Sequence, residues 1–181
     1  IGHGPFSHAL EKTILTNVHH EDVSILFMKR LNEQMNNRLS LAIDIFTNKY
    51  HKKFLHQLVS SQLDVDRLDY LTRDSYFTGV HEGVIGYDRL IEMMDVENDE
   101  LVIEHKGIYS VEKFIIARRV MYWQVYLHKT VICAEQMLIK TLKRAKYLAK
   151  NGTSLFATPA LHFFLYHDFE LKDFNSDLQL L

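Results

Sequence analysis

Two histidines and a glutamate near the start of the chain have the types and spacing for acid–base chemistry. His8 and Glu11 are three residues apart, so on a helix their side chains would share one face. A carboxylate beside an imidazole fixes the tautomer of the ring and raises its basicity, which suits proton transfer. His20, which precedes Glu21, is close enough in sequence to fold back onto that pair. The alternative is a surface that is simply rich in histidine, since the chain contains 11 of them.

A second candidate group lies between residues 64 and 74, where four aspartates alternate with basic and aromatic side chains. Asp66, Tyr70 and Asp74 follow one another at intervals of four residues, so a helix would stack them on one face. Arg67 adjoins that face. Metal ions, phosphates and sugar hydroxyls are the natural partners of such a mixture. The alternative is a solvated amphipathic helix that carries salt bridges between its own turns.

A third group repeats the same spacing with different side chains. Arg118, Tyr122 and Tyr126 are also four residues apart in turn. An arginine with two tyrosines could hold a phosphate and stack against a base. The alternative is that the aromatic side chains belong to the core and that Arg118 pairs with an acid.

Helices must position these residues, because apolar residues recur at helical spacing and only 7 glycines and 2 prolines interrupt the chain. The pattern predicts helices over residues 8–16, 20–36, 38–48, 50–62 and 64–76. Residues 89–109 favour a small β-hairpin, with its turn at the polar run 97–100. Nothing from residue 110 to 150 breaks a helix, which predicts one helix of about forty residues. A short helix should follow from Pro159. Because helices are predicted over most of the chain, the expected fold class is mostly α.

Length and charge limit the classes of protein that remain. A chain of 181 residues is expected to form a single domain over 1–181. A net charge of −2 argues against a protein that binds nucleic acid through a strongly basic surface. The only cysteine, Cys133, suits a reducing compartment. No run of about 20 apolar residues and no signal peptide is visible, so the expected location is cytoplasmic, without membrane association.

In order and rough spacing, four segments resemble those of the HD-domain deoxynucleoside triphosphate triphosphohydrolases: IGHGPFSHALE, HHE, LDVDRLDYLTRDS and ARRVMYWQVYLHK. That family includes the bacterial dGTP triphosphohydrolases and the vertebrate enzyme with a SAM and an HD domain. The resemblance covers about residues 1–130. It implies an HD-domain helical bundle that hydrolyses a dNTP to deoxynucleoside and triphosphate. It also implies a divalent metal ion (Mg, Mn, Fe, Ni or Zn) and assembly into a homo-oligomer.

The resemblance further implies a role for each matching residue. His8, Glu11 and His20 match the catalytic group, and Asp66 matches a metal ligand. The positions that match substrate contacts are His3, Arg67, Tyr70, Asp74, Arg118, Tyr122 and Tyr126. Among these, the two arginines and His3 match phosphate contacts, whereas Tyr70, Asp74 and Tyr126 match residues beside the deoxyribose. The family's adjacent His-Asp metal pair normally stands immediately before the segment that begins at Ile1, so the domain is expected to be incomplete at its start, and also at its end.

Two departures from the family pattern concern the base. Tyr122 replaces a histidine of the vertebrate enzyme, and Leu127 replaces a glutamine near the base. Base preference therefore does not transfer. Two other functions stay open: an HD phosphohydrolase that acts on another nucleotide or phosphoester, and a non-catalytic nucleotide-sensing subunit.

Overall fold

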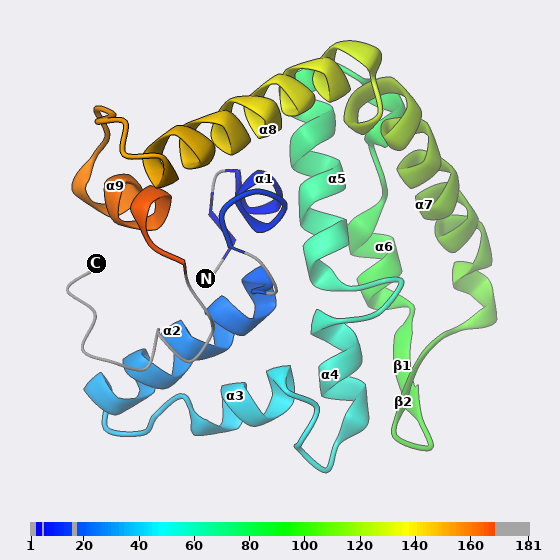
Figure 1. The fold of residues 1–181 in the computed structure, drawn as a ribbon. Coiled ribbons are helices and arrows are strands. Elements are labelled where there is room, and N and C mark those ends of the chain that lie inside the picture. The colour runs from blue at the N-terminus through cyan, green and yellow to red at the C-terminus, as the bar shows by residue number, and fades with distance from the viewer. Residues whose placement is uncertain (1–2, 5, 16–17, 169–181) are drawn as a thin grey trace. The chain divides into compact units, whose positions relative to one another are not determined.

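The protein is mostly helical and contains a two-stranded antiparallel sheet (Figure 1), as the sequence predicts. The computed structural model describes residues 3–4, 6–15 and 18–168. The chain divides into two compact units, one made of Ile1–Leu39 with Cys133–Leu181 and the other of Ser40–Ile132. The expectation of a single domain stays a prediction. Among the described residues, no helix is long and apolar enough to cross a membrane.

The first unit is built from helices at both ends of the chain. Its elements are α1 (Ser7–Glu11), α2 (His20–Gln34), most of α8 (Lys129–Lys150) and α9 (Pro159–Tyr166). Ile14, Ala149 and Leu165 are buried together, so the segment after α1 packs against α8 and α9. The Lys146 ammonium also donates to the Ile14 carbonyl at 2.8 Å. These contacts hold α1, which carries two of the predicted catalytic residues.

The second unit is organised around α5 and α7. Its elements are α3 (Ser40–Phe46), α4 (Lys53–Val59), α5 (Val65–Thr78), η1 (His81–Gly83), α6 (Tyr87–Glu92), β1 (Met94–Glu97), β2 (Glu100–Ile103), η2 (His105–Gly107), α7 (Ile108–Met121) and η3 (Tyr122–Tyr126). Their shared core consists of Leu68, Leu71, Ile85, Leu90, Phe114, Ala117 and Met121. At Gly83 a Cβ would come within 2.6 Å of the Met121 sulfur, so only glycine fits this contact between η1 and α7.

The hairpin is present but shorter than predicted. β1 pairs with β2 in antiparallel register from Met94↔Ile103 to Glu97↔Glu100. Asn98 and Asp99 both have positive φ, 52° and 65°, as a two-residue turn requires. The first part of the predicted range 89–109 is instead helix α6, because Leu90 is fully buried in the core and fixes that segment on a helical turn.

The predicted helix over 110–150 is wrong, because the structure divides it. α7 ends at Met121, the five residues of η3 form a π-helix, and α8 begins at Lys129 (Figure 1). The wider turn closes with a 2.7 Å hydrogen bond from the Leu127 N–H to the Tyr122 carbonyl. No glycine or proline occurs here, so local propensity does not explain the change. Single π-turns inside helices are often found at functional sites.

The buried position of Leu71 yields a stability prediction. Leu71 is fully buried on α5, whereas Leu41 on α3 is 52% exposed. Leu71→Ala should reduce the free energy of unfolding by about 2–5 kcal/mol, because it removes buried apolar surface and leaves a cavity. Leu41→Ala, the matched control, should change it by less than about 1 kcal/mol. Urea titration followed by circular dichroism measures both, and equal losses would contradict the described core.

Candidate functional site

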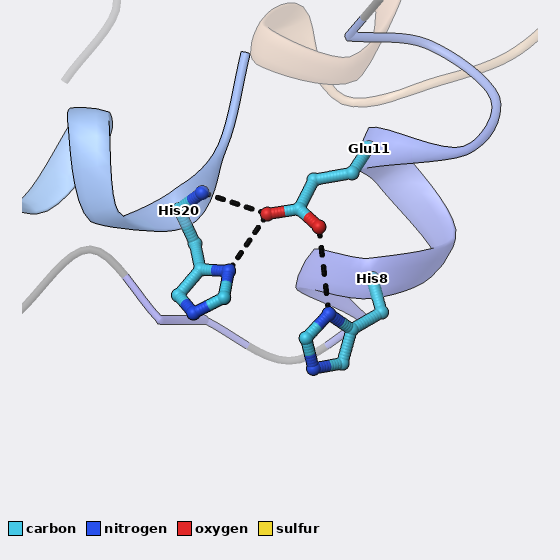
Figure 2. Close-up of side chains that lie close together, drawn as sticks. All are labelled: His8, Glu11 and His20. Atoms are coloured by element: carbon cyan, nitrogen blue, oxygen red, sulfur yellow. Dashed lines mark hydrogen bonds and ion pairs between the residues drawn. The ribbon is translucent and has the colours of Figure 1, made fainter. Parts of the chain in front are cut away.

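The predicted catalytic residues come together in the first unit. Glu11, the last residue of α1, lies between the rings of His8 and His20 (Figure 2). One Glu11 oxygen is 2.8 Å from Nδ1 of His20 and also accepts the His20 backbone N–H at 2.7 Å. The other oxygen is 3.4 Å from Nδ1 of His8. Glu11 therefore joins the end of α1 to the start of α2.

Local sequence explains why His20 is held there. His19 precedes α2 as its N-cap and forms a capping box with Asp22, in which each side chain accepts a backbone N–H of the other residue. His20 is therefore the first residue of α2, and its ring reaches back to Glu11. Its Nε2 lies 3.3 Å from the Glu21 carboxylate.

His3 lies against the same cluster. Its ring centroid is 5.2 Å from that of His8 and 4.8 Å from that of His20, and the His8 and His20 centroids are 5.2 Å apart. All three pairs meet edge to face. The four residues that the sequence suggested near the start of the chain thus form one group. The histidines of this group contact one another and are not scattered over the surface.

The electrostatics of this cluster keep Glu11 ionised. Burial is the largest influence on the Glu11 carboxyl and acts to raise its pKa. The hydrogen bonds from the His20 ring, the His20 backbone and the His8 ring together outweigh burial, so the pKa of Glu11 lies below its ordinary value. As a carboxylate, Glu11 accepts hydrogen bonds from both rings and orients them.

The remaining candidates belong to the second unit, where α5 and η3 bring together the residues that the resemblance assigns to the sugar. The Tyr126 hydroxyl donates to the Asp74 carboxylate at 2.7 Å. The Tyr126 ring lies edge to face with Tyr70, at 6.0 Å between centroids, and with Tyr122, at 5.2 Å. The salt bridge along α5 that was the alternative for Asp74 forms instead between Arg73 and Asp69.

Burial and charge both act on the tyrosines of this group. Burial raises the pKa of Tyr126 far above its ordinary value, and its hydrogen bond to Asp74 adds to the increase. Burial also raises the pKa of Tyr70, with a further contribution from Tyr122. Both phenols are therefore protonated at neutral pH, and Tyr126 remains a hydrogen-bond donor to Asp74.

The two arginines have different surroundings. Nη1 of Arg118 donates to Oε1 of Gln62 at 3.1 Å, and its guanidinium carbon lies 5.8 Å from the centroid of the Tyr122 ring. Arg67 instead pairs with the buried Asp64, the N-cap of α5, and donates to the Ser61 carbonyl. Arg118 therefore belongs to the tyrosine group, whereas Arg67 is also a structural partner of the cap.

The sequence interpretation missed two of these partners. Asp64 is 3% exposed, and its side chain accepts the Arg67 backbone N–H at 2.8 Å. An aspartate just before an apolar-periodic run is a recognisable N-cap signal, so Asp64 could have been separated from the other aspartates. Nothing in the sequence indicated Gln62, because its contact with Arg118 joins residues 56 positions apart.

Potential metal ligands occur in both units. Asp66 is exposed in the first turn of α5, where it offers one carboxylate. In the other unit, His8, Glu11 and His20 each place a ligand atom within 4.8 Å of the other two, a spacing that could hold a metal ion. The role of Asp66 stays a prediction.

Comparison with known proteins finds similarity to proteins with an HD domain. Residues 85–157 match the family model described as the HD associated region. The uncharacterized protein YwfO of Bacillus subtilis is 38% identical over 172 residues, covering 91% of this chain and 39% of that protein. A Dictyostelium discoideum protein named deoxynucleoside triphosphate triphosphohydrolase SAMHD1 homolog is 30% identical, covering 86% of this chain and 33% of that protein.

A solved structure gives the same relationship. The crystal structure of a phosphohydrolase from Bacteroides thetaiotaomicron is similar with a TM-score of 0.93 and 61% identity, covering 99% of this chain and 44% of that one. These matches support placing the chain in the HD-domain phosphohydrolase family. The chain spans 33% to 44% of the length of these three relatives, so the activity and substrates of the whole protein are proposals.

Proposed function

We propose that this chain forms part of an HD-domain enzyme that hydrolyses deoxynucleoside triphosphates to deoxynucleoside and triphosphate. The observation that supports this substrate is the contact between the Tyr126 hydroxyl and the Asp74 carboxylate, with Tyr70 beside it. A carboxylate held by a phenol among aromatic rings suits a sugar hydroxyl and the flat faces of a deoxyribose. The similarity to a protein named as a dNTP triphosphohydrolase points the same way.

Each group would act on a different part of the substrate. Asp74 would accept a hydrogen bond from the 3′-hydroxyl, while Tyr70 and Tyr126 pack against the sugar. Arg118 would neutralise phosphate charge, and its place beside Tyr122 leaves that ring next to the nucleotide. His8 and His20, oriented by Glu11, would transfer a proton or orient the oxygen nucleophile at the α-phosphorus.

The family also implies a divalent metal ion, and Asp66 is the residue of this sequence that the resemblance assigns as a ligand. Asp66 would contribute an exposed carboxylate, an oxygen ligand that suits a divalent ion. When bound, such an ion supplies charge stabilisation at a phosphoryl oxygen. Homo-oligomerisation, a cytoplasmic location and the absence of nucleic acid and membrane partners stay predictions.

The reaction products test this function. An active preparation of the protein should release intact triphosphate and a deoxynucleoside from a dNTP. Attack at the α-phosphorus breaks the bond between that phosphorus and the 5′-oxygen, and the oxygen leaves with the deoxynucleoside. Ion chromatography separates triphosphate from pyrophosphate and orthophosphate. Orthophosphate with a nucleoside diphosphate would contradict the proposal, and hydrolysis of nucleoside monophosphates alone would indicate another phosphoester. Tight dNTP binding without any product would indicate a nucleotide sensor.

A further inference from the structure

Helix α7 carries apolar side chains on two faces, and one of these faces packs into the core of the second unit. Phe114, Ala117 and Met121 are buried in the core that α7 shares with α5. On the outward face, Ile116 is 62% exposed and Tyr109 is 79% exposed. A helix at the surface of a globular unit usually turns charged and polar residues to solvent. Because the outward face of α7 is apolar instead, it has the composition of a contact surface.

The exposed side chains form one row along α7 and into η3. Tyr109, Ile116 and Trp123 are seven residues apart, and all three are exposed. Glu112 and Arg119, which are also exposed, lie between them at the spacing of a heptad. The row continues into the π-turn, because the guanidinium carbon of Arg119 lies 4.5 Å from the centroid of the Trp123 ring. These five residues are called the α7 stripe below.

The α7 stripe is complementary to itself when it is reversed. Ile116 is at its centre, an acid and a base stand on either side, and an aromatic residue is at each end. A two-fold axis through Ile116, perpendicular to α7, would place a second α7 antiparallel to the first. Tyr109 would then meet Trp123 of the second copy, and Glu112 would lie beside Arg119 of that copy. Each contact would occur twice, as in an isologous interface.

We propose that a second copy of this chain docks on the α7 stripe through an antiparallel pair of α7 helices. The charges select this occupant and this orientation. Within the described part of the chain, Glu112 and Arg119 enter no salt bridge, so both are available to the other copy. A parallel pair would instead set like charges against each other. Tryptophan, tyrosine and arginine are also the residues that contribute most to binding at protein interfaces.

Sedimentation velocity of the 181-residue chain over a series of concentrations tests the proposal. The chain should form dimers that dissociate on dilution. Ile116→Glu should raise the dissociation constant at least about tenfold, because two carboxylates would meet at the two-fold axis. Trp123→Ala should raise it by at least as much, since it removes a large aromatic contact twice. Ile91→Glu is the matched control: Ile91 on α6 is 53% exposed and lies outside the stripe, so the dissociation constant should not change.

Reversal of the two charges tests the orientation of the pair. Glu112→Arg and Arg119→Glu should each weaken association at least about tenfold, because each variant sets like charges against each other across the axis. A mixture of the two variants should form heterodimers with nearly the affinity of the unmodified chain, since every charge then meets its opposite. Lys143→Glu, a reversal at an exposed position of α8, should leave association unchanged.

Three outcomes would overturn the proposal: a monomer at every concentration, an Ile116→Glu variant that associates as the unmodified chain does, or charge variants that fail to associate when mixed. Dissociation by Ile91→Glu but not by Ile116→Glu would place the contact on α6 and would also overturn it. Circular dichroism checks the fold of every variant, and recovery in the mixture shows that both charge variants are folded. Association is measured without nucleotide, so this proposal and that of dNTP hydrolysis can fail separately.

Discussion

In an active preparation of the protein, His8→Ala should lower turnover of a dNTP by about 10²–10⁴-fold, the range expected for loss of a proton-transfer group. Glu11 holds the His8 and His20 rings on one carboxylate, so removing one ring disrupts the group that is proposed to act at the α-phosphorus. Because His8 is proposed to act at the α-phosphorus and not on the sugar, the loss should be equal for a normal substrate and its 2′,3′-dideoxy analogue. Steady-state kinetics on both substrates measures it.

The control for this experiment is a histidine outside the cluster. His51→Ala removes an exposed imidazole between α3 and α4 and should leave turnover unchanged. Glu11→Gln should reduce turnover in the same direction as His8→Ala, because an amide orients two imidazoles less firmly than a carboxylate. If His8→Ala keeps full turnover while remaining folded, the cluster is not part of the chemistry.

Asp74→Asn should weaken use of a dNTP about ten- to a hundredfold, and the loss should shrink for a 2′,3′-dideoxy substrate, which has no 3′-hydroxyl to contact. A hydrogen bond to a charged acceptor is worth about 1.5–3 kcal/mol, which corresponds to that range. The comparison of two enzymes on two substrates is a double-mutant cycle in which the hydroxyl is one partner. The measured quantity is kcat/KM for each of the four combinations.

Tyr126→Phe provides a matched variant for the same cycle. It removes the hydroxyl that donates to Asp74 at 2.7 Å but keeps the aromatic ring that packs against Tyr70. As a positioning residue, Tyr126 should show a smaller loss than Asp74, and that loss should also shrink for the dideoxy substrate. Equal losses from Asp74→Asn on both substrates would mean that Asp74 only supports η3 through Tyr126. The sugar-reading role would then be wrong, while the phosphohydrolase activity could remain.

Features that depend on neighbouring residues were predictable from the sequence. α5 begins after Asp64 and ends at Gly79, whose φ of 71° suits glycine. Pro159 opens α9, and the turn at Asn98-Asp99 separates the two strands. Caps, tight turns and proline positions act over a few residues, so their effect can be read directly from sequence. The spacing of His8 and Glu11 on one helix belongs to the same category.

Features that depend on distant contacts were decided by the tertiary structure. The predicted helix over 110–150 contains no residue that breaks a helix, yet it opens into a π-turn where Tyr126 bonds to Asp74, 52 positions earlier. The ring of His20 meets Glu11 only because the chain folds back between α1 and α2. Helical spacing predicts which face of its own helix carries Asp74 and which carries Tyr126, but not that the two faces meet. Which faces meet is set by the packing of side chains in the shared core, a property of the whole fold rather than of any local segment.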